Sequence, residues 1–241
     1  MLKSLVAATI AGFAASAALA SPVYQFNASN PSPQNSAAGQ ISSIASTYDA
    51  GTQMFNWDVT FSNGVAAHTD GYWLVVSTGP NPKGSQGQLA IMYFDATNLA
   101  NPAVSIYRYN GQNSNSSYST PGDLLASTKA SGQTTIQASA SDSGGKRTFD
   151  LQVSAAAINS KYNAGNGYPD WQGIQYGSQI GVWFHPVANL TTSYNGQKLT
   201  NFCGTEGWFD SANECTTKIP APGSLAILAT GGVLAARRRR P

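Results

Sequence analysis

Few residues in this 241-residue sequence are suited to catalysis, and most of them are carboxylic acids. Cleavage of a glycosidic bond generally requires two positioned carboxyl groups, and the chain contains only two glutamates, Glu206 and Glu214. Aspartates are the alternative, and Asp58 and Asp70 are the nearest to the ends of expected strands. Other aspartates stand close to Gly or Asn, as in DAGT, SDSGG and DATN, where they usually form turns. We therefore assign no catalytic residue.

The two histidines do not complete a catalytic motif. His68 and Asp70 are separated by one residue, a spacing that does not guarantee contact, so His68 is interpreted as a loop residue. His185 precedes Pro186, which is expected to end a strand, and its role is interpreted as structural. The sequence lacks a G-x-S-x-G elbow, a phosphate-binding glycine loop and an H-E-x-x-H motif. Two thiols and two histidines also offer few ligands for a metal, so we expect neither a metal nor a cofactor.

Aromatic side chains point to binding rather than to turnover. Tyr168, Trp171 and Tyr176 fall in GYPDWQGIQYG, a segment expected to be a loop, and Trp208 lies between the two cysteines. Flat rings stack on sugar rings, and neighbouring groups such as the Asp170 carboxylate bond sugar hydroxyls. These five residues are the predicted glycan-binding set. The alternative is that the rings cap the ends of the protein core.

The two cysteines, Cys203 and Cys215, predict one disulfide. They bracket the segment CGTEGWFDSANEC, and in an exported chain a pair with this spacing is most simply bonded. Closing a loop of about 13 residues is expected to stabilise the fold by roughly 3 kcal/mol.

An all-β framework is expected to position these residues. In MFNWDVTFSNG, Phe55, Trp57 and Val59 alternate with polar residues, which is the period-two pattern of a strand with one buried face. Asn-Gly pairs at the ends of such runs favour antiparallel hairpins. Further runs of this kind are GYWLVVS, LAIMYFDAT, AVSIYRYNG, TTIQASAS, RTFDLQV, IGVWFHPV and TTSYNGQKL.

Only SAAAINSKYN, residues 154 to 163, has a helical pattern, with Ser154 as a possible N-cap. We therefore predict an antiparallel β-sandwich or jelly roll with one short helix over residues 41 to 217. Residues 21 to 40 contain Pro31 and Pro33 and are expected to form an N-terminal extension or loop.

The N-terminus predicts export. Lys3 is followed by the apolar run LVAATIAGFAASAALA, in which Ala18 and Ala20 provide the small residues of a cleavage site before Ser21. We expect residues 1 to 20 to be a helical secretory signal peptide that is removed.

The C-terminus predicts a membrane-inserted tail over residues 218 to 241. Its apolar run, residues 223 to 236, covers roughly 21 Å as a helix, which is barely enough to cross a bilayer. A cluster of four arginines follows directly and is expected to stay on the cytoplasmic side of the membrane. The cluster consists of Arg237, Arg238, Arg239 and Arg240.

Proline residues precede this apolar run, and the whole tail resembles a known sorting signal. The order Pro220, Ala221, Pro222 and Gly223, then the apolar run and the arginines, resembles the PEP-CTERM signal of Gram-negative-type bacteria. The resemblance implies cleavage near the prolines by exosortase, a membrane protease-transpeptidase, which leaves the body at the cell surface or in an extracellular polymeric matrix. The resemblance covers about the last 22 residues, and Ala221 occupies the position of the name-giving Glu. A related sorting system and a plain C-terminal anchor are the alternatives.

Charge argues against nucleic acid as a partner. Of the 13 Lys and Arg residues, one lies in the signal and four in the tail, which leaves eight against 11 acidic residues in the body. A net charge near −3 offers no basic face to phosphates. The sequence thus predicts an exported surface or matrix protein that is held in the membrane before processing by an exosortase-like protease. A carbohydrate-binding module that contacts extracellular polysaccharide is the second interpretation, and a glycan hydrolase or lyase is the third.

Overall fold

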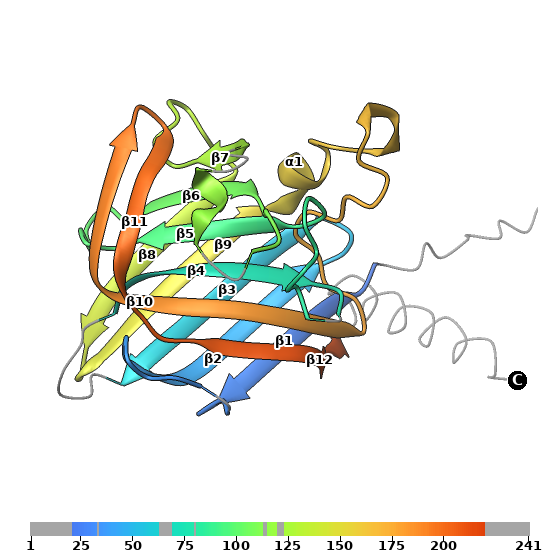
Figure 1. The fold of residues 1–241 in the computed structure, drawn as a ribbon. Helices are drawn as coiled ribbons and strands as arrows, with labels where there is room; N and C mark the ends of the chain where they lie inside the picture. The colour runs from blue at the N-terminus through green and yellow to red at the C-terminus, as the bar shows by residue number, and fades with distance from the viewer. Residues whose placement is uncertain are drawn as a thin grey trace, which may run out of the picture. The chain divides into compact units, whose positions relative to one another are not determined.

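Strands make up most of the described chain, in agreement with the period-two pattern (Figure 1). The computed structural model describes residues 21–32, 34–62, 69–79, 81–112, 115–119 and 123–219. The predicted signal peptide, His68 and the predicted tail from Pro220 onward lie outside these residues. Residues Ser21–Ile219 belong to one compact unit.

The first of two antiparallel sheets has six strands in the order β13-β1-β2-β3-β9-β8. Gly144 and Gly145 form the two-residue turn between β8 and β9, and both have the positive φ that such a hairpin requires. The strands are β1 (Val23–Ser29), β2 (Gln40–Asp49), β3 (Met54–Ser62), β8 (Ile136–Ser143), β9 (Lys146–Ser154) and β13 (Thr217–Ile219).

The second sheet has seven strands and the order β11-β10-β4-β5-β6-β7, with β12 also paired to β10. The predicted Asn195-Gly196 pair lies where β10 turns into β11: Asn195 pairs with Lys198, and Gly196 begins the turn with a φ of +61°. The strands are β4 (Thr69–Ser77), β5 (Ala90–Asp95), β6 (Ala103–Arg108), β7 (Leu124–Ser127), β10 (Gln179–Asn195), β11 (Lys198–Glu206) and β12 (Phe209–Cys215). The helices are α1 (Ala155–Asn159) and the short 3-10 turns η1 (Ser116–Tyr118) and η2 (Ala164–Asn166).

The long strand β10 bends, and its far end rises with β11 along one side of the sheet (Figure 1). Its pairing with β11 shifts register between Ala188 and Thr191, and Asn189, which lies in this bulge, has a φ of +52°. Asparagine tolerates this left-handed conformation better than most residues, so the bulge can form without glycine. The bend brings the apolar side chains of the β10–β11 hairpin over the outer face of the second sheet.

The main core lies between the two sheets. On β3, Phe55, Trp57 and Val59 are fully buried while the residues between them face outward, which confirms the predicted alternation. From the second sheet, Tyr72 and Phe184 pack against this layer, with Trp57 and Phe184 ring centroids 5.4 Å apart. Burial of each such side chain contributes about 1.5–3 kcal/mol, so this layer is the main source of folding energy.

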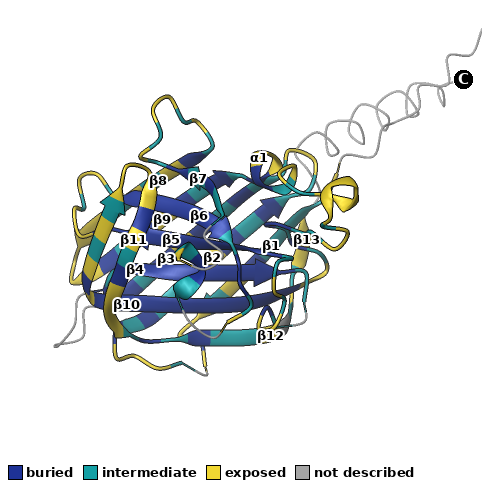
Figure 2. Ribbon diagram, turned by 45° about the horizontal axis from the view of Figure 1, so that its top comes forward, coloured by how far each residue is buried: buried dark blue, intermediate teal, exposed yellow. Residues whose placement is uncertain are grey.

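A second apolar cluster covers the outer face of the seven-stranded sheet. Trp73 and Trp183 point outward from β4 and β10, where they meet Phe202 of β11 and Tyr118 of η1. Strands β4, β5 and β10 are consequently buried along most of their length, whereas exposed residues lie on the loops and along β8 and β11 (Figure 2). Both faces of these strands are therefore apolar.

Three sequence expectations need correction. Residues 21 to 40 are not all loop, because β1 pairs with β2 and buries Phe26, although the proline-containing part after Ser29 is irregular. The helix predicted over residues 154 to 163 is present but shortened to α1. Pro186 does not end a strand but lies inside β10. It faces the break between β11 and β12, where its missing N–H leaves no strand partner without a donor, and its carbonyl accepts a hydrogen bond from Gly207.

The predicted disulfide is wrong: Cys203 and Cys215 are free and exposed. The segment between them is not a closed loop, because β11 and β12 run end to end along β10. Cys203 faces Thr191 and Cys215 faces Gln179, twelve residues apart on that strand. Twelve extended residues span about 40 Å along the strand, whereas the Cα atoms of a disulfide lie about 4.4–6.8 Å apart.

No helix in the described part of the chain is long and apolar enough to span a membrane. The apolar run predicted to do so, residues 223 to 236, falls outside that part.

Candidate functional site: a polar groove on the six-stranded sheet

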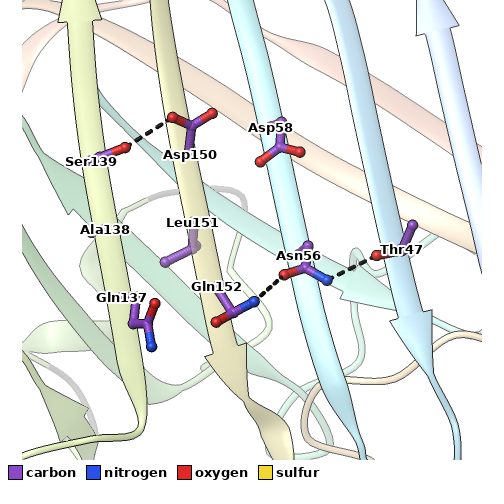
Figure 3. Close-up of a pocket in the computed structure, with 9 residues that line it drawn as sticks. All are labelled: Thr47, Asn56, Asp58, Gln137, Ala138, Ser139, Asp150, Leu151 and Gln152. Carbon is purple, nitrogen blue, oxygen red and sulfur yellow. Dashed lines mark hydrogen bonds between the residues drawn. The ribbon is translucent and has the colours of Figure 1, made fainter.

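An open groove of about 480 Å³ runs over the outer face of the six-stranded sheet (Figure 3). It forms because the alternation of β2, β3 and β9, and the weaker alternation of β8, turns the intervening polar residues outward together. The lining residues are Thr47, Asn56, Asp58, Gln137, Ala138, Ser139, Asp150, Leu151 and Gln152.

The strand register orders the polar side chains into two rows that cross the strands. The first row, the amide row, consists of Gln137, Gln152, Asn56 and Thr47 on four successive strands. Gln152 Nε2 donates to Asn56 Oδ1 at 2.9 Å, and Asn56 Nδ2 donates to Thr47 Oγ1 at 2.9 Å. Each amide thus holds its neighbour in a fixed orientation and still has donor or acceptor capacity for a ligand.

The second row, the carboxylate row, lies two residues farther along each strand, about 7 Å away. It consists of Ser139, Asp150 and Asp58, with Ser139 Oγ donating to Asp150 Oδ2 at 2.8 Å. Asp58 and Asp150 are direct cross-strand partners, an arrangement in which like charges repel. Burial and then the charge of Asp150 raise the pKa of Asp58 above its ordinary value.

The two rows together give the groove a polar floor, and no aromatic or basic side chain is among the lining residues. Amides donate and accept hydrogen bonds, and carboxylates accept them strongly. Such a surface suits a ligand with many hydroxyl or amino groups better than an apolar ligand.

The predicted glycan-binding residues do not share this groove. Tyr168 and Trp171 lie in one loop and both contact Tyr162, with ring centroids 4.2 and 4.9 Å from it. The Trp171 indole donates to the Asn159 carbonyl at 3.1 Å, so the ring is half-buried against α1 rather than displayed. Asp170, in the same loop, is exposed.

The remaining two members of that set lie elsewhere. Tyr176 is buried in the main core, and its hydroxyl bonds Ser46 at 2.5 Å. Trp208 lies at the break between β11 and β12, where it forms an isolated bridge with Asn35. Tyr176 therefore follows the alternative of a core-capping ring, and the set does not form one site.

A second group of titratable residues lies under the covered face of the seven-stranded sheet. His185 stacks on Trp73 with centroids 3.9 Å apart, and in the neutral ring its Nε2 accepts a hydrogen bond from the Trp183 indole. Its Nδ1 lies 3.5 Å from Glu206 Oε2, and its Nε2 lies 3.1 Å from Asp210 Oδ1. We call these three residues the His185 clasp.

Burial disfavours the charged form of the His185 ring, but Asp210 and Glu206 outweigh this effect, so its pKa is raised. Asn115 also donates to Glu206 at 2.8 Å. The histidine side chain is only 11% exposed and holds β11 and β12 to β10. The clasp therefore joins three strands, β10, β11 and β12.

The other candidate carboxylates do not converge with Asp58. Asp70 lies 3.2 Å from the Arg147 guanidinium and accepts from the backbone N–H of Leu190. Glu214 accepts a hydrogen bond from Ser211. Among the described residues, no three His, Cys, Asp or Glu side chains are arranged to hold a metal ion.

Sequence reasoning named Asp58 but missed the other groove residues. Asp150 and Gln152 come from RTFDLQV and Gln137 from TTIQASAS, runs that were predicted as strands without their register. The outward polar alternation of each run was visible in the sequence, but which runs are neighbours depends on pairing between distant segments.

Comparison with known protein families, curated proteins and solved structures finds no match for this chain.

Proposed function

We propose that this protein is a non-enzymatic, exported β-sandwich that binds polysaccharide in the groove on its six-stranded sheet. The observation that carries the proposal is the pair of polar rows, one across four neighbouring strands and one across three of them, in an open groove of about 480 Å³ (Figure 3). Sugars present hydroxyl groups along an extended chain, and both rows offer donors or acceptors at regular spacing.

The groove composition favours a hydrated ligand that is held by many weak contacts. Each hydrogen bond to a sugar replaces one to water and contributes about 0.5–1.5 kcal/mol net. The lining residues include no aromatic ring that would add stacking energy. We therefore expect modest affinity for a short oligosaccharide.

Glycan binding by the secreted protein tests this proposal. The double variant Asn56→Ala, Gln152→Ala removes the centre of the amide row, and we expect it to lose at least tenfold in affinity for any glycan found on an array. The matched control is Gln197→Ala, Asn201→Ala, which removes the same two side-chain types from the β10–β11 hairpin on the other sheet. Equal binding by both variants would rule out the groove.

Glycan cleavage is the second candidate function, and the carboxylate row is the observation that favours it. A carboxyl group with a raised pKa beside a second carboxylate is the arrangement that a general acid and its partner require. Incubation of the same glycans with the wild type and with Asp58→Asn separates the candidates. Release of new reducing ends by the wild type alone would establish an enzyme, whereas binding without release supports a binding module.

We also propose that the chain is exported, cleaved after Ala20 and sorted through its tail by an exosortase-like membrane protease. The order of prolines, apolar run and arginines supports this proposal. The first strand begins at Val23 and the last described strand ends at Ile219, so cleavage at both predicted places would leave every described strand intact.

Mass spectrometry of the C-terminus in the native host tests the sorting proposal. Replacement of Pro220 and Pro222 by Ala should leave a full-length precursor in the membrane, because the segment would no longer present an extended backbone to a protease. If the wild-type protein also ends at Pro241, the tail is an anchor rather than a sorting signal.

A further inference from the structure

The carboxylate row carries negative charge that the groove does not neutralise. Asp58 and Asp150 face each other directly, and none of the nine lining residues is Lys or Arg. The nearest arginine on β9, Arg147, is engaged by Asp142 at 2.7 Å and by Asp70 at 3.2 Å. Cross-strand pairs of like charge are destabilising, so this pair is retained at a cost to the fold.

Five of the nine other described carboxylates, those of Asp70, Asp123, Asp142, Glu206 and Asp210, have a cationic or histidine partner. Asp123 pairs with Arg108 at 2.7 Å, and Glu206 and Asp210 flank His185. Asp150 accepts one hydrogen bond, from Ser139, whereas Asp58 accepts none from any residue that the structure describes. The acceptor capacity of Asp58 is therefore free for a donor from outside the protein.

The neighbouring amide row supplies the second half of a recognition site. Asn56 and Gln152 are locked by their mutual hydrogen bond and lie about 7 Å from the aspartate pair along the same two strands. A ligand that crosses both rows thus meets amide groups at one point and two carboxylates at the next. Hydroxyl groups satisfy the first row, and a positively charged donor best satisfies the second.

We infer that the groove selects polysaccharides with free amino groups over neutral and acidic ones. The inference rests on the proposed function and names its substrate class: a chain of amino sugars whose protonated amine lies between Asp58 and Asp150. An ammonium group donates charge-assisted hydrogen bonds to both carboxylates and removes their repulsion. A uronic acid at the same place would add a third negative charge.

Binding of two matched oligosaccharides tests the inference. Glucosamine tetramer and N-acetylglucosamine tetramer share a backbone, and only the first carries amines. We expect the secreted protein to bind the glucosamine tetramer about tenfold more tightly in calorimetry at pH 6 and low salt, and this preference should shrink as salt is added. Alginate oligomers should not bind.

Asp58→Asn is the decisive variant, and Asp170→Asn is its matched control. Both remove one exposed negative charge, but Asp170 lies in the loop after η2, away from the groove. Asp58→Asn should abolish the tenfold preference, while Asp170→Asn should keep it. Equal effects of the two variants would show general attraction to an acidic protein and would overturn the inference.

Failure of the inference and failure of the proposed function give different results. If both tetramers bind equally and the Asn56→Ala, Gln152→Ala variant loses both, the groove binds glycan and the amine selectivity is wrong. If neither tetramer binds but a neutral glucan does, the substrate class is also wrong. If no glycan binds, both proposals are wrong. A preference that disappears with a chelator and returns with Ca²⁺ would assign the aspartate pair to a cation and overturn the inference.

Discussion

The outer faces of the two sheets differ in how they are covered and in how their charges are balanced. On the seven-stranded sheet, Trp73 and Trp183 lie beneath a second apolar cluster, and the titratable His185 there is held between two carboxylates. On the six-stranded sheet, the outer face is open, and Asp58 and Asp150 face each other with no Lys or Arg among the nine described residues that line the groove. The apolar cluster on the first face therefore adds stability to the fold. The unbalanced aspartate pair on the second face reduces that stability, a trade-off that is common where a surface serves function rather than folding.

The largest expected effect is on the covered face. Trp73→Ala removes a fully buried side chain that stacks on His185, and we expect it to lower the free energy of unfolding by about 3–5 kcal/mol. Asn56→Ala on the open face should cost less than about 1.5 kcal/mol. Denaturant titration of both variants measures the difference. Similar losses would mean that the second cluster contributes little to folding.

The His185 clasp should make stability depend on pH. The folded-state pKa of His185 lies above its ordinary 6.5, so the contribution of the charged ring is fully present below pH 6.5 and is lost as pH rises through the folded pKa. The wild type should have a higher free energy of unfolding than His185→Gln, and this difference should be about 1 kcal/mol larger at pH 6 than at pH 9. The figure is modest because both carboxylates are about one-third exposed.

Unfolding measurements at the two pH values check this prediction. Asp170→Asn serves as a control for general charge effects. A difference between the wild type and His185→Gln that grows with pH would show that the neutral ring is the stabilising form.

A smaller effect of opposite sign is expected on the open face. Asp58→Asn should raise the free energy of unfolding by about 0.2–1 kcal/mol at pH 7, because it removes one member of a repelling cross-strand pair. The folded-state pKa of Asp58 is raised, so the ionised carboxylate destabilises the fold at pH values above that pKa, and the gain from Asp58→Asn should vanish in acid. A loss of stability at pH 7 would mean that a partner already holds the carboxylate.

The smallest effect is expected at the two cysteines. Cys203→Ser and Cys215→Ser should each change stability by less than about 0.5 kcal/mol, because both residues are exposed and unpaired. Alkylation of the folded protein should modify both thiols, and a reductant should leave the melting temperature unchanged. A Cys203–Cys215 peptide in a non-reducing digest would restore the disulfide.

Local patterns predicted the strands but not their partners. The alternation around Trp57 and the Asn195-Gly196 turn are both found in the structure, because each depends on residues that are close in sequence. The segment CGTEGWFDSANEC looks like a loop because of its glycines, yet it lies along β10 as β11 and β12. That pairing is a long-range property, and the disulfide prediction failed with it.

The groove was only partly predictable for the same reason. Asp58 stands out in its own strand, but its neighbour Asp150 is 92 residues farther along the chain and meets it only through the β3–β9 register. The aromatic residues predicted to bind glycan were chosen by residue type alone. Tyr176 shows why this is insufficient, because a large ring in a glycine-rich segment can be buried in the core.

Strand β13 has only three residues, and it pairs with β1 so that Ile219 lies opposite Val23. A pulling force on the chain beyond Ile219 would act first on this short strand and break its pairs with β1 one after another, starting at Ile219. Strand β1 would stay in place because seven of its residues pair with β2. Three extended residues would release about 10 Å of slack before the rest of the sandwich bears any tension. If the tail is held at a surface as proposed, loss of the β13 pairing would therefore absorb a pull on the chain before the rest of the sandwich unfolds.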